Sequence, residues 1–171
     1  ILQIAEPFSA VLDLLYTLPG LDKNPMTAIA ILSEIGPDMS VFPSSKHLVS
    51  WAGCCPRNDQ SNQKVKSRRI SRAGSYLKPL LVQVANALIK SKKHPEFKER
   101  YHRIKSRRGH KKAIIAVCKM LLTAIWNMLS KLEPYNPEGF LEHRPVKQEK
   151  TLTVSQALEL LRLRGYTITN Q

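Results

Sequence analysis

The sequence predicts an all-α fold, organised as a single helical domain over residues 1–132. Three observations support this prediction. Apolar residues recur at helical spacing through most of the chain, glycine and proline separate the periodic segments, and 171 residues can build one sizeable core. Because 43% of the residues are hydrophobic, we expect a folded chain and not a disordered basic tail.

The N-terminal residues 5–36 predict two helices joined by a short turn. Apolar spacing over residues 8–15 predicts an amphipathic helix, which Pro19 ends. Residues 26–35 predict a second, short helix, and Gly36 stops it. The pair resembles a helix-hairpin-helix, although its turn is about two residues longer than usual.

A helix-hairpin-helix presents backbone N–H groups to a DNA phosphate at a helix N-terminus, where the helix dipole assists. We therefore predict nucleic-acid contacts at Gly20, Leu21 and Thr27. An ordinary helical hairpin in the core is the alternative interpretation.

The middle of the chain predicts one more helix and then an irregular segment. Ser44 or Ser45 can cap a helix that runs to about Ala52. Residues 53–72 are polar and lack periodicity, so we predict a long basic loop or a short hairpin there.

The helical core is predicted over residues 75–132, as three helices. The first covers 76–92 and must hold Pro79 in its first turn, where a missing N–H costs little. The second covers 95–107, beginning at a proline and ending before a glycine. The third, 110–132, is the longest and most apolar.

Residues 133–171 are predicted to be a linker and a short C-terminal helix. Three prolines lie within 133–153 and argue against regular structure there. Ser155 is then placed to cap a helix over 156–164, which Gly165 ends.

The charge of the chain is concentrated in two segments. The net charge is +14; residues 57–72 contribute +5 and residues 90–112 contribute +9, while the remainder balances. Basic clusters of this density are typical of nucleic-acid binding, because each neutralised phosphate releases counterions. A solvated, lysine-rich face is the alternative. A membrane surface is disfavoured because the clusters lack interleaved large apolar residues.

We predict nucleic-acid backbone contacts from side chains in and beside these two segments. They are Arg57, Lys64, Lys66, Arg68, Arg69, Ser71, Arg72, Lys78, Arg103, Arg107, Arg108, Lys111 and Lys112.

The cysteines and apolar runs predict a protein without zinc and without a membrane span. The cysteines, Cys54, Cys55 and Cys118, have no C-x-x-C spacing and are interpreted as reduced, buried thiols of a cytosolic protein. No apolar run approaches the roughly 18–20 residues that cross a bilayer, and the N-terminus has no basic leader. The chain is interpreted as a piece of a longer protein.

Acidic residues are too scarce for a metal-dependent nuclease site within this chain. Between residues 43 and 128 the acids are Asp59, Glu96 and Glu99, whereas a two-metal site needs several clustered carboxylates. Neither G-x-S-x-G nor a phosphate-binding G-x-x-x-x-G-K-[ST] motif occurs. We therefore predict no metal or other cofactor bound by these residues.

Serine is the nucleophile that the basic segment offers. Ser61, Ser67 and Ser71 stand among its six cations. A serine hydroxyl can attack a backbone phosphate and form a phosphoserine link to DNA, while Arg and Lys stabilise the charge that develops on phosphorus. The alternative is a serine that merely makes the loop polar.

A series of short motifs in a fixed order resembles a known family over about residues 12–132. The motifs are Leu18-Pro19-Gly20-Leu21, Thr27-Ala28, Ser33-Glu34-Ile35-Gly36, Phe42-Pro43-Ser44, Trp51-Ala52-Gly53, Ser61…Lys64 and Gly74…Leu77. In this order they resemble the C-terminal transposase domain of the IS110 family of insertion-sequence transposases.

The resemblance implies a DNA recombinase whose composite site cuts and rejoins DNA. In that family this domain contributes a serine, here Ser61, with Ser71 as the next candidate. A RuvC-like domain elsewhere in the full-length protein contributes acids that bind a divalent metal, Mg²⁺. The resemblance also implies a structured guide RNA, a homo-oligomer, and the cytoplasm of a bacterial or archaeal cell.

The sequence departs from the family pattern at three places. Asn62 and Gln63 follow Ser61, where the family has a glycine, Pro79 stands where an arginine is common, and Ser33 mildly changes the Ala-Glu-Ile-Gly motif. We expect the isolated chain to fold, to bind DNA weakly and to be inactive alone. Two alternatives are a non-catalytic nucleic-acid-binding module and a repair enzyme using Asp22 or Lys23 beside the helical hairpin.

Overall fold

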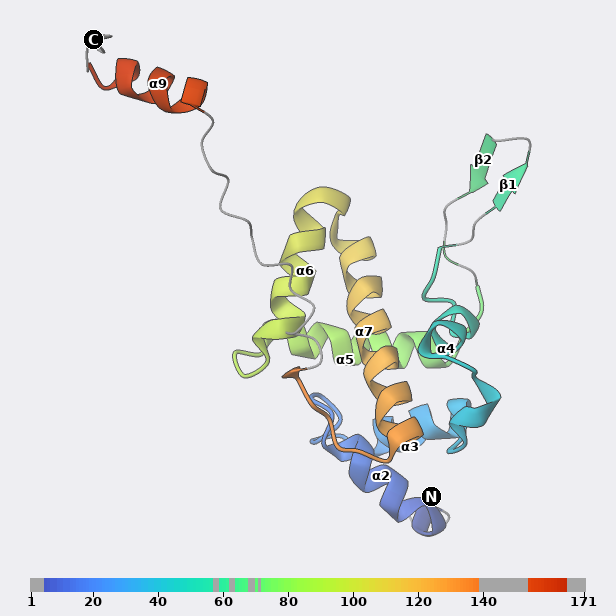
Figure 1. Ribbon diagram of the computed structural model, residues 1–171. Helices are drawn as coiled ribbons and strands as arrows, with labels where there is room; N and C mark the ends of the chain where they lie inside the picture. The colour runs from blue at the N-terminus through green and yellow to red at the C-terminus, as the bar shows by residue number, and fades with distance from the viewer. Residues whose placement is uncertain are drawn as a thin grey trace. The chain divides into compact units, whose positions relative to one another are not determined.

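A computed structural model of the chain describes residues 5–56, 59–61, 64–67, 70, 72–138 and 154–165. The chain divides into two units, residues 1–141 and 142–171. The first unit contains the predicted helices around one core, together with a two-stranded hairpin (Figure 1). The all-α prediction is therefore confirmed, and the basic segment forms the short hairpin that was one of its two predicted forms.

The α-helices of the first unit follow the predicted boundaries to within about two residues. They are α2 (Ser9–Tyr16), α3 (Pro25–Ile35), α4 (Ser45–Trp51), α5 (Leu77–Lys90), α6 (Pro95–Arg108) and α7 (His110–Lys131). Two short 3-10 helices, η1 (Glu6–Phe8) and η2 (Met39–Val41), were not predicted. The strands are β1 (Asp59–Ser61) and β2 (Lys64–Ser67).

Proline and side-chain caps explain why these helices start where they do. Pro25 and Pro95 occupy first-turn positions of α3 and α6, where the absent N–H would have no partner in the helix. Pro79 lies in the first turn of α5, as predicted. Asn24 caps α3 by accepting a hydrogen bond from the Thr27 N–H at 3.2 Å.

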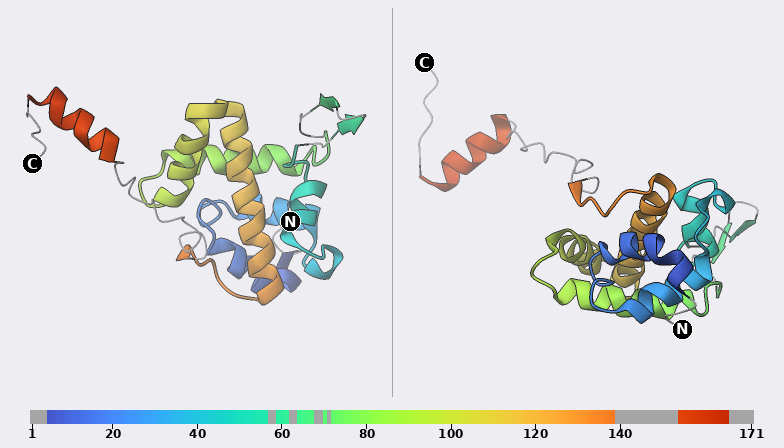
Figure 2. Two further views of the ribbon diagram at one scale, coloured as in Figure 1. Left: turned by 45° about the horizontal axis from the view of Figure 1, so that its top comes forward. Right: turned by 90° about the horizontal axis from the view of Figure 1, so that it is seen from below.

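Helix α7 is the centre of the core. Ten of its 22 residues are buried, and it contacts α2, η2, α4, α5 and α6. Figure 2 shows α7 crossing α5, with α2 and α4 beside it. Each large apolar side chain buried in this way stabilises the fold by about 1.5–3 kcal/mol.

Helix α7 is also long and apolar enough to cross a membrane by length and composition alone. The expectation that no segment reaches this length was therefore wrong. However, 56% of the apolar stretch is buried inside the unit, which is the pattern of a core helix in a soluble protein.

The chain leaves the helical unit at the end of α4, forms the hairpin, and re-enters the unit at the start of α5, beside the place where it left. We call residues 51–53 and 74–76 the hairpin junction. Gly74 has a φ of +65°, and a Cβ there would lie 2.4 Å from the carbonyl oxygen of Ala52. Only glycine permits this approach, so Gly74 brings the two ends of the basic segment together.

The hairpin itself is antiparallel and short. Gln60 pairs with Val65 and Ser61 pairs with Lys64, with an irregularity in register next to Asp59. An isolated bridge between Pro56 and Ile70 continues the pairing toward the junction. In Figure 1 the hairpin lies beyond the helices, at the end where α4 and α5 meet.

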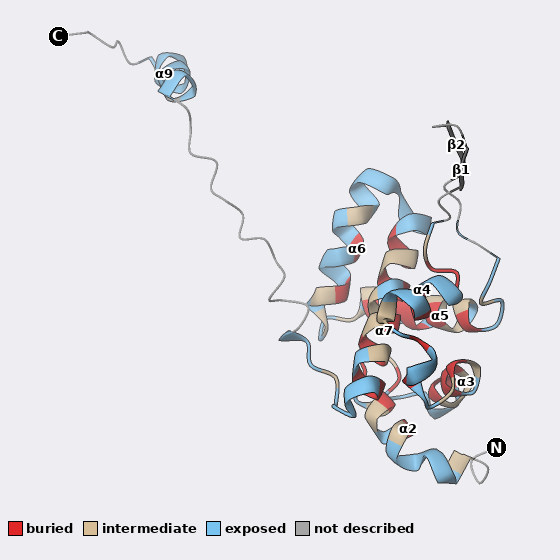
Figure 3. Cartoon of the chain, turned by 45° about the vertical axis from the view of Figure 1, so that its right-hand side comes forward, coloured by how far each residue is buried: buried red, intermediate tan, exposed pale blue. Residues whose placement is uncertain are grey.

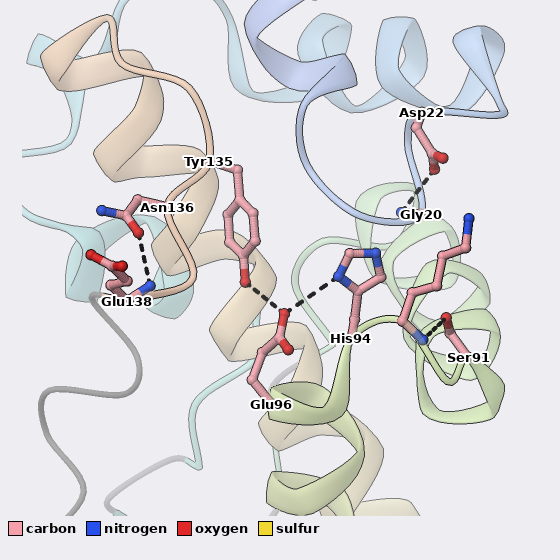
Figure 4. A network of polar contacts seen from close by, with 9 residues as sticks. Gly20, Asp22, Ser91, His94, Glu96, Tyr135, Asn136 and Glu138 are labelled. Carbon is pink, nitrogen blue, oxygen red and sulfur yellow. Dashed lines mark hydrogen bonds and ion pairs between the residues drawn. The ribbon is translucent and has the colours of Figure 1, made fainter.

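The chain after α7 returns to the helical unit. Tyr135 stacks on Phe97 with ring centroids 6.3 Å apart, and its N–H donates to Thr17 Oγ1 at 2.9 Å. Its hydroxyl donates to Glu96 Oε1 at 3.1 Å, and His94 Nδ1 lies 3.6 Å from the same oxygen (Figure 4). The first residues of the predicted linker therefore belong to the first unit, which extends to Leu141.

The second unit contains helix α9 (Val154–Leu163). It begins one residue before Ser155, so Ser155 lies inside the helix and the predicted cap at that residue is wrong. Gly165 follows with a φ of +81°, consistent with the predicted C-terminal stop. Its leucines are exposed within this unit.

We predict that Gly74→Ala destabilises the chain by at least about 3 kcal/mol, because a Cβ adds both backbone strain and overlap with the Ala52 carbonyl. The matched control is Gly36→Ala, which has a φ of +74° but no atom within 4 Å of the added Cβ. That control carries backbone strain without the overlap, of order 1–3 kcal/mol, and is expected to cost less than Gly74→Ala. Urea unfolding followed by circular dichroism measures both, and equal losses would contradict the close approach.

We predict that Tyr135→Phe lowers the free energy of unfolding by about 1 kcal/mol at neutral pH, through loss of the hydrogen bond to Glu96. Burial, and then the nearby Glu96 charge, raise the pKa of Tyr135 above its ordinary 10.0. Ionisation is therefore disfavoured in the folded state, and the Tyr135 contribution is lost as the pH rises above about 10.

The deficit of Tyr135→Phe relative to wild type should consequently shrink between pH 7 and pH values above about 10. Urea unfolding at each pH measures the deficit. Tyr76→Phe is the control, since Tyr76 is exposed and its loss of a hydroxyl should change stability at neither pH. A deficit that grows with pH would contradict the assigned environment of Tyr135.

Candidate nucleic-acid interface

The larger basic cluster lies where α6 passes into α7. We call residues 103–112 the elbow. Gly109, with a φ of +80°, is both the C-cap of α6 and the N-cap of α7, so one residue reverses the chain. The cations predicted to bind nucleic acid here are all exposed: Arg103, Arg107, Arg108, Lys111 and Lys112.

Packing explains why the cations of α6 face solvent. Phe97 and Tyr101 are buried and Ile104 is half-buried, and this spacing forms one stripe of the helix. The remaining faces carry the charge, and Figure 3 shows exposed residues over most of α6. Both acids of α6, Glu96 and Glu99, lie in its first two turns, so every charged residue of the elbow is basic.

Like charges crowd along this surface. Burial, and next the nearby Arg103, lower the pKa of Arg100. Lys111 and Lys112 stand in the first turn of α7, where the positive end of the helix dipole makes a cation unfavourable. An arrangement that costs stability in the free chain becomes favourable when an anion neutralises it.

Contacts beneath the elbow fix its shape. The Tyr101 hydroxyl and His110 Nδ1 are 2.8 Å apart, which joins the middle of α6 to the start of α7. The ammonium of Lys105 lies 5.4 Å from the centre of the Tyr101 ring, within cation–π range. The elbow is therefore a preformed basic surface.

The smaller basic cluster lies in the hairpin. Ser61 is the last residue of β1 and pairs with Lys64, the first residue of β2, and Lys66 follows in the same strand. Arg72 is exposed close to the junction. The other predicted contacts of this segment, Arg57, Arg68, Arg69 and Ser71, lie outside the described residues.

The elbow and the hairpin lie at the same end of the helical unit. Figures 1 and 3 agree on this placement, although α6 and the hairpin are far apart in the sequence. The two charged segments that composition singled out thus belong to one end of the fold.

The turn of the predicted helix-hairpin-helix is packed differently from a phosphate-binding turn. Leu21 is fully buried and its N–H donates to the Leu18 carbonyl at 3.1 Å, so the predicted contact has no exposed group at this residue in the structure. Gly20 faces α5, where an added Cβ would lie 2.8 Å from Val84 Cγ1, and its N–H donates to Asp22 Oδ1 at 3.2 Å. Asp22 thus accepts the hydrogen bond that the Gly20 N–H would have to donate to a bound phosphate.

Thr27 is 7% exposed, and its N–H donates to the Asn24 side chain. The local pattern of two helices and a Pro-Gly turn was correctly identified. In the structure this turn and α3 pack against α5, an arrangement that favours the alternative of an ordinary helical hairpin in the core.

Lys78 is half-buried near the buried thiols of Cys54 and Cys118. Burial raises the pKa of Cys54 to about 11 and that of Cys118 to about 12, while the charge of Lys78 acts in the opposite direction. Both thiols are therefore protonated at neutral pH, in agreement with the interpretation of reduced, buried cysteines.

Two aromatic side chains at the junction were missed by sequence reasoning. Tyr76 is 75% exposed and Trp51 is 45% exposed. Tyr76 was included in the helix that begins there, but it falls outside the apolar stripe formed by Leu77, Leu81 and Val84. That mismatch, next to a basic segment, is the signal that could have identified it.

The part of the chain that the structure describes holds no group of three or more His, Cys, Asp or Glu residues that could bind a metal ion. Of its few acids near the basic surfaces, Glu96 already contacts His94 and Tyr135.

The fold and the exposed cations define a basic, all-α domain. Residues 12–102, more than half of the chain, match the model of the Transposase IS116/IS110/IS902 family. The chain belongs to this family, as the order of its short motifs predicted.

Two relatives illustrate this membership. The chain is 30% identical to the pilin gene-inverting protein of Moraxella bovis over 126 residues, covering 72% of this chain and 38% of the relative. It is 29% identical to the transposase for insertion sequence element IS1111A of Coxiella burnetii over 122 residues, covering 70% of this chain and 33% of the relative. The chain thus spans less than two fifths of these relatives. No solved structure matches it.

Proposed function

We propose that this chain is the serine-bearing, DNA-engaging part of a transposase that cuts and rejoins DNA through Ser61. The observation that carries the proposal is the position of Ser61 at the turn end of a basic hairpin, paired with Lys64, in a chain of this family. The names of the relatives, a gene-inverting protein and a transposase, are consistent with DNA rearrangement.

The chemistry is a transfer of one phosphodiester bond. The Ser61 oxygen attacks phosphorus, an O–P bond to serine forms, and the bond to one sugar oxygen breaks. The proton that leaves the serine hydroxyl is balanced by the proton that the released sugar oxygen gains. Attack by the sugar hydroxyl of a second DNA end reverses these changes and restores free serine, so bond energy is retained and no cofactor is consumed.

The hairpin supplies both reach and charge for this step. Ser61 and Lys64 are partner positions in the two-stranded ladder, and partner positions in such a ladder are close neighbours. In this proposal Lys64 is therefore the cation that serves the phosphate held at Ser61. A cation there stabilises the additional negative charge of the pentavalent transition state.

The described residues do not fit a divalent metal, because they lack a cluster of acidic ligands. We assign no step in this chain to a metal. Any Mg²⁺ used in the reaction belongs, in this proposal, to a RuvC-like domain in another part of the full-length protein.

The elbow binds phosphates away from the reacting bond and orients the DNA. Its exposed cations and its preformed shape support this role. For the full-length protein the proposal includes a structured guide RNA and a homo-oligomer. The RNA would present additional phosphates, and the other subunits would present additional copies of the elbow.

A non-catalytic nucleic-acid-binding module is the second candidate. The observation that favours it is the sequence after Ser61, where Asn62 and Gln63 replace the glycine of the family pattern. In this alternative the hairpin and the elbow contact only the nucleic-acid backbone.

We predict that DNA binding by the chain weakens steeply as the salt concentration rises. The double variant Arg107→Ala, Arg108→Ala should make the slope of log affinity against log salt concentration shallower by about 2, because each phosphate contact contributes about 0.9 to that slope. The control, Lys92→Ala with Lys93→Ala, removes the same charge from exposed positions just before the start of α6 and should leave the slope nearly unchanged. Fluorescence anisotropy over a salt series measures the slopes. A flat wild-type slope would exclude the electrostatic interface.

We predict that Ser61→Ala in the full-length protein reduces recombination to background and removes the covalent protein–DNA adduct, while DNA affinity stays unchanged. Denaturing gel electrophoresis of radiolabelled DNA detects the adduct. Ser67→Ala, in the facing strand of the same hairpin, is the control and should retain both recombination and the covalent adduct. Recombination that survives Ser61→Ala would reject this nucleophile, leaving Ser71 or the non-catalytic alternative.

A further inference from the structure

The hairpin junction exposes two large aromatic side chains, Tyr76 and Trp51. Tyr76, immediately before α5, is 75% exposed, more than any other tyrosine for which an exposure is described. Trp51, at the end of α4, is 45% exposed and makes an edge-type contact with Phe42, with ring centroids 5.6 Å apart. Large aromatic rings left in water at one place are typical of a binding surface.

The backbone brings these two positions to the same place. Ala52 and Gly74 are in direct backbone contact, since a Cβ on Gly74 would overlap the Ala52 carbonyl. Trp51 precedes one partner of this contact, and Tyr76 lies two residues after the other. Trp51 therefore lies where the chain enters the basic hairpin, and Tyr76 lies where the chain leaves it.

The surroundings of the junction favour an anionic strand with accessible ring faces. Arg72 is exposed nearby, and the acid closest in sequence, Asp59, lies out in β1. Aromatic side chains bind nucleic acids by stacking on bases, and basic neighbours hold the phosphates between them. In a continuous duplex the faces of the bases are covered by their neighbours, so stacking of this kind requires an unpaired or displaced base.

We propose that Tyr76, with Trp51 at the same junction, forms a stacking platform for an unpaired base of a nucleic-acid strand. This inference rests on the proposed function and specifies the substrate for it: the strand beside the reactive hairpin is locally unpaired. A platform beside the hairpin holds one nucleotide fixed while Ser61 engages a phosphate.

The test compares oligonucleotides that differ only in their bases. The chain is titrated with fluorescent oligothymidylate, with an abasic strand of the same length, with oligouridylate and with a blunt duplex, all at one ionic strength. Wild type should bind the base-bearing strands about 5- to 100-fold more tightly than the abasic strand, which is the range that stacking provides. Tighter binding of either base-bearing strand supports the platform and identifies DNA or RNA as its preferred partner.

Three variants test whether the preference for base-bearing strands comes from the Tyr76 ring. Tyr76→Ala should lose the preference for bases while keeping wild-type affinity for the abasic strand, and Tyr76→Phe should restore the preference because it keeps the ring. Phe8→Ala, which removes an exposed aromatic ring in η1, should behave as wild type.

The two possible failures are distinguishable. Equal wild-type affinity for base-bearing and abasic strands, or a preference that survives Tyr76→Ala, overturns the stacking platform and leaves the electrostatic interface intact. Absence of binding to every oligonucleotide overturns the proposed function and the platform with it.

Discussion

Burial of α7 is the constraint on which the rest of the first unit depends. Helices from both ends of the unit pack on this one element, including α2 near the N-terminus and α6 directly before it. Its buried face accepts apolar side chains only, so charge is confined to the surface and to the segments that leave the core. The two basic clusters are found in such places: the hairpin outside the helices, and the elbow where α7 emerges.

Much of the fold could be predicted from the sequence because its signals are local. Pro79, Pro95 and Gly109 set helix boundaries through their own backbone chemistry, and the structure places those boundaries where they were expected. Concentration of charge in two segments was likewise a property of the sequence alone. Family membership followed from the order of short motifs, none of which is specific by itself.

The features that could not be predicted from the sequence depend on contacts between residues that are distant in the chain. A Pro-Gly turn has the same local pattern whether it faces DNA or the core, and only the packing of Gly20 against Val84 decides between them. Tyr135 joins the helical unit through Glu96 and Thr17, partners that no local pattern indicates. The exposure of Tyr76 also depends on the fold, since tyrosine is intermediate in its tendency to be buried and the sequence alone does not decide its environment.

Helix α7 has one further, mechanical consequence. It begins at the elbow and runs through the core, a distance of about 33 Å for 22 residues. The hydrogen bond between Tyr101 and His110 braces its outer end against α6. In the proposed function, a force that a bound strand exerts on the elbow is therefore transmitted along α7 to the helices packed on it, so the core and not a single turn resists that force.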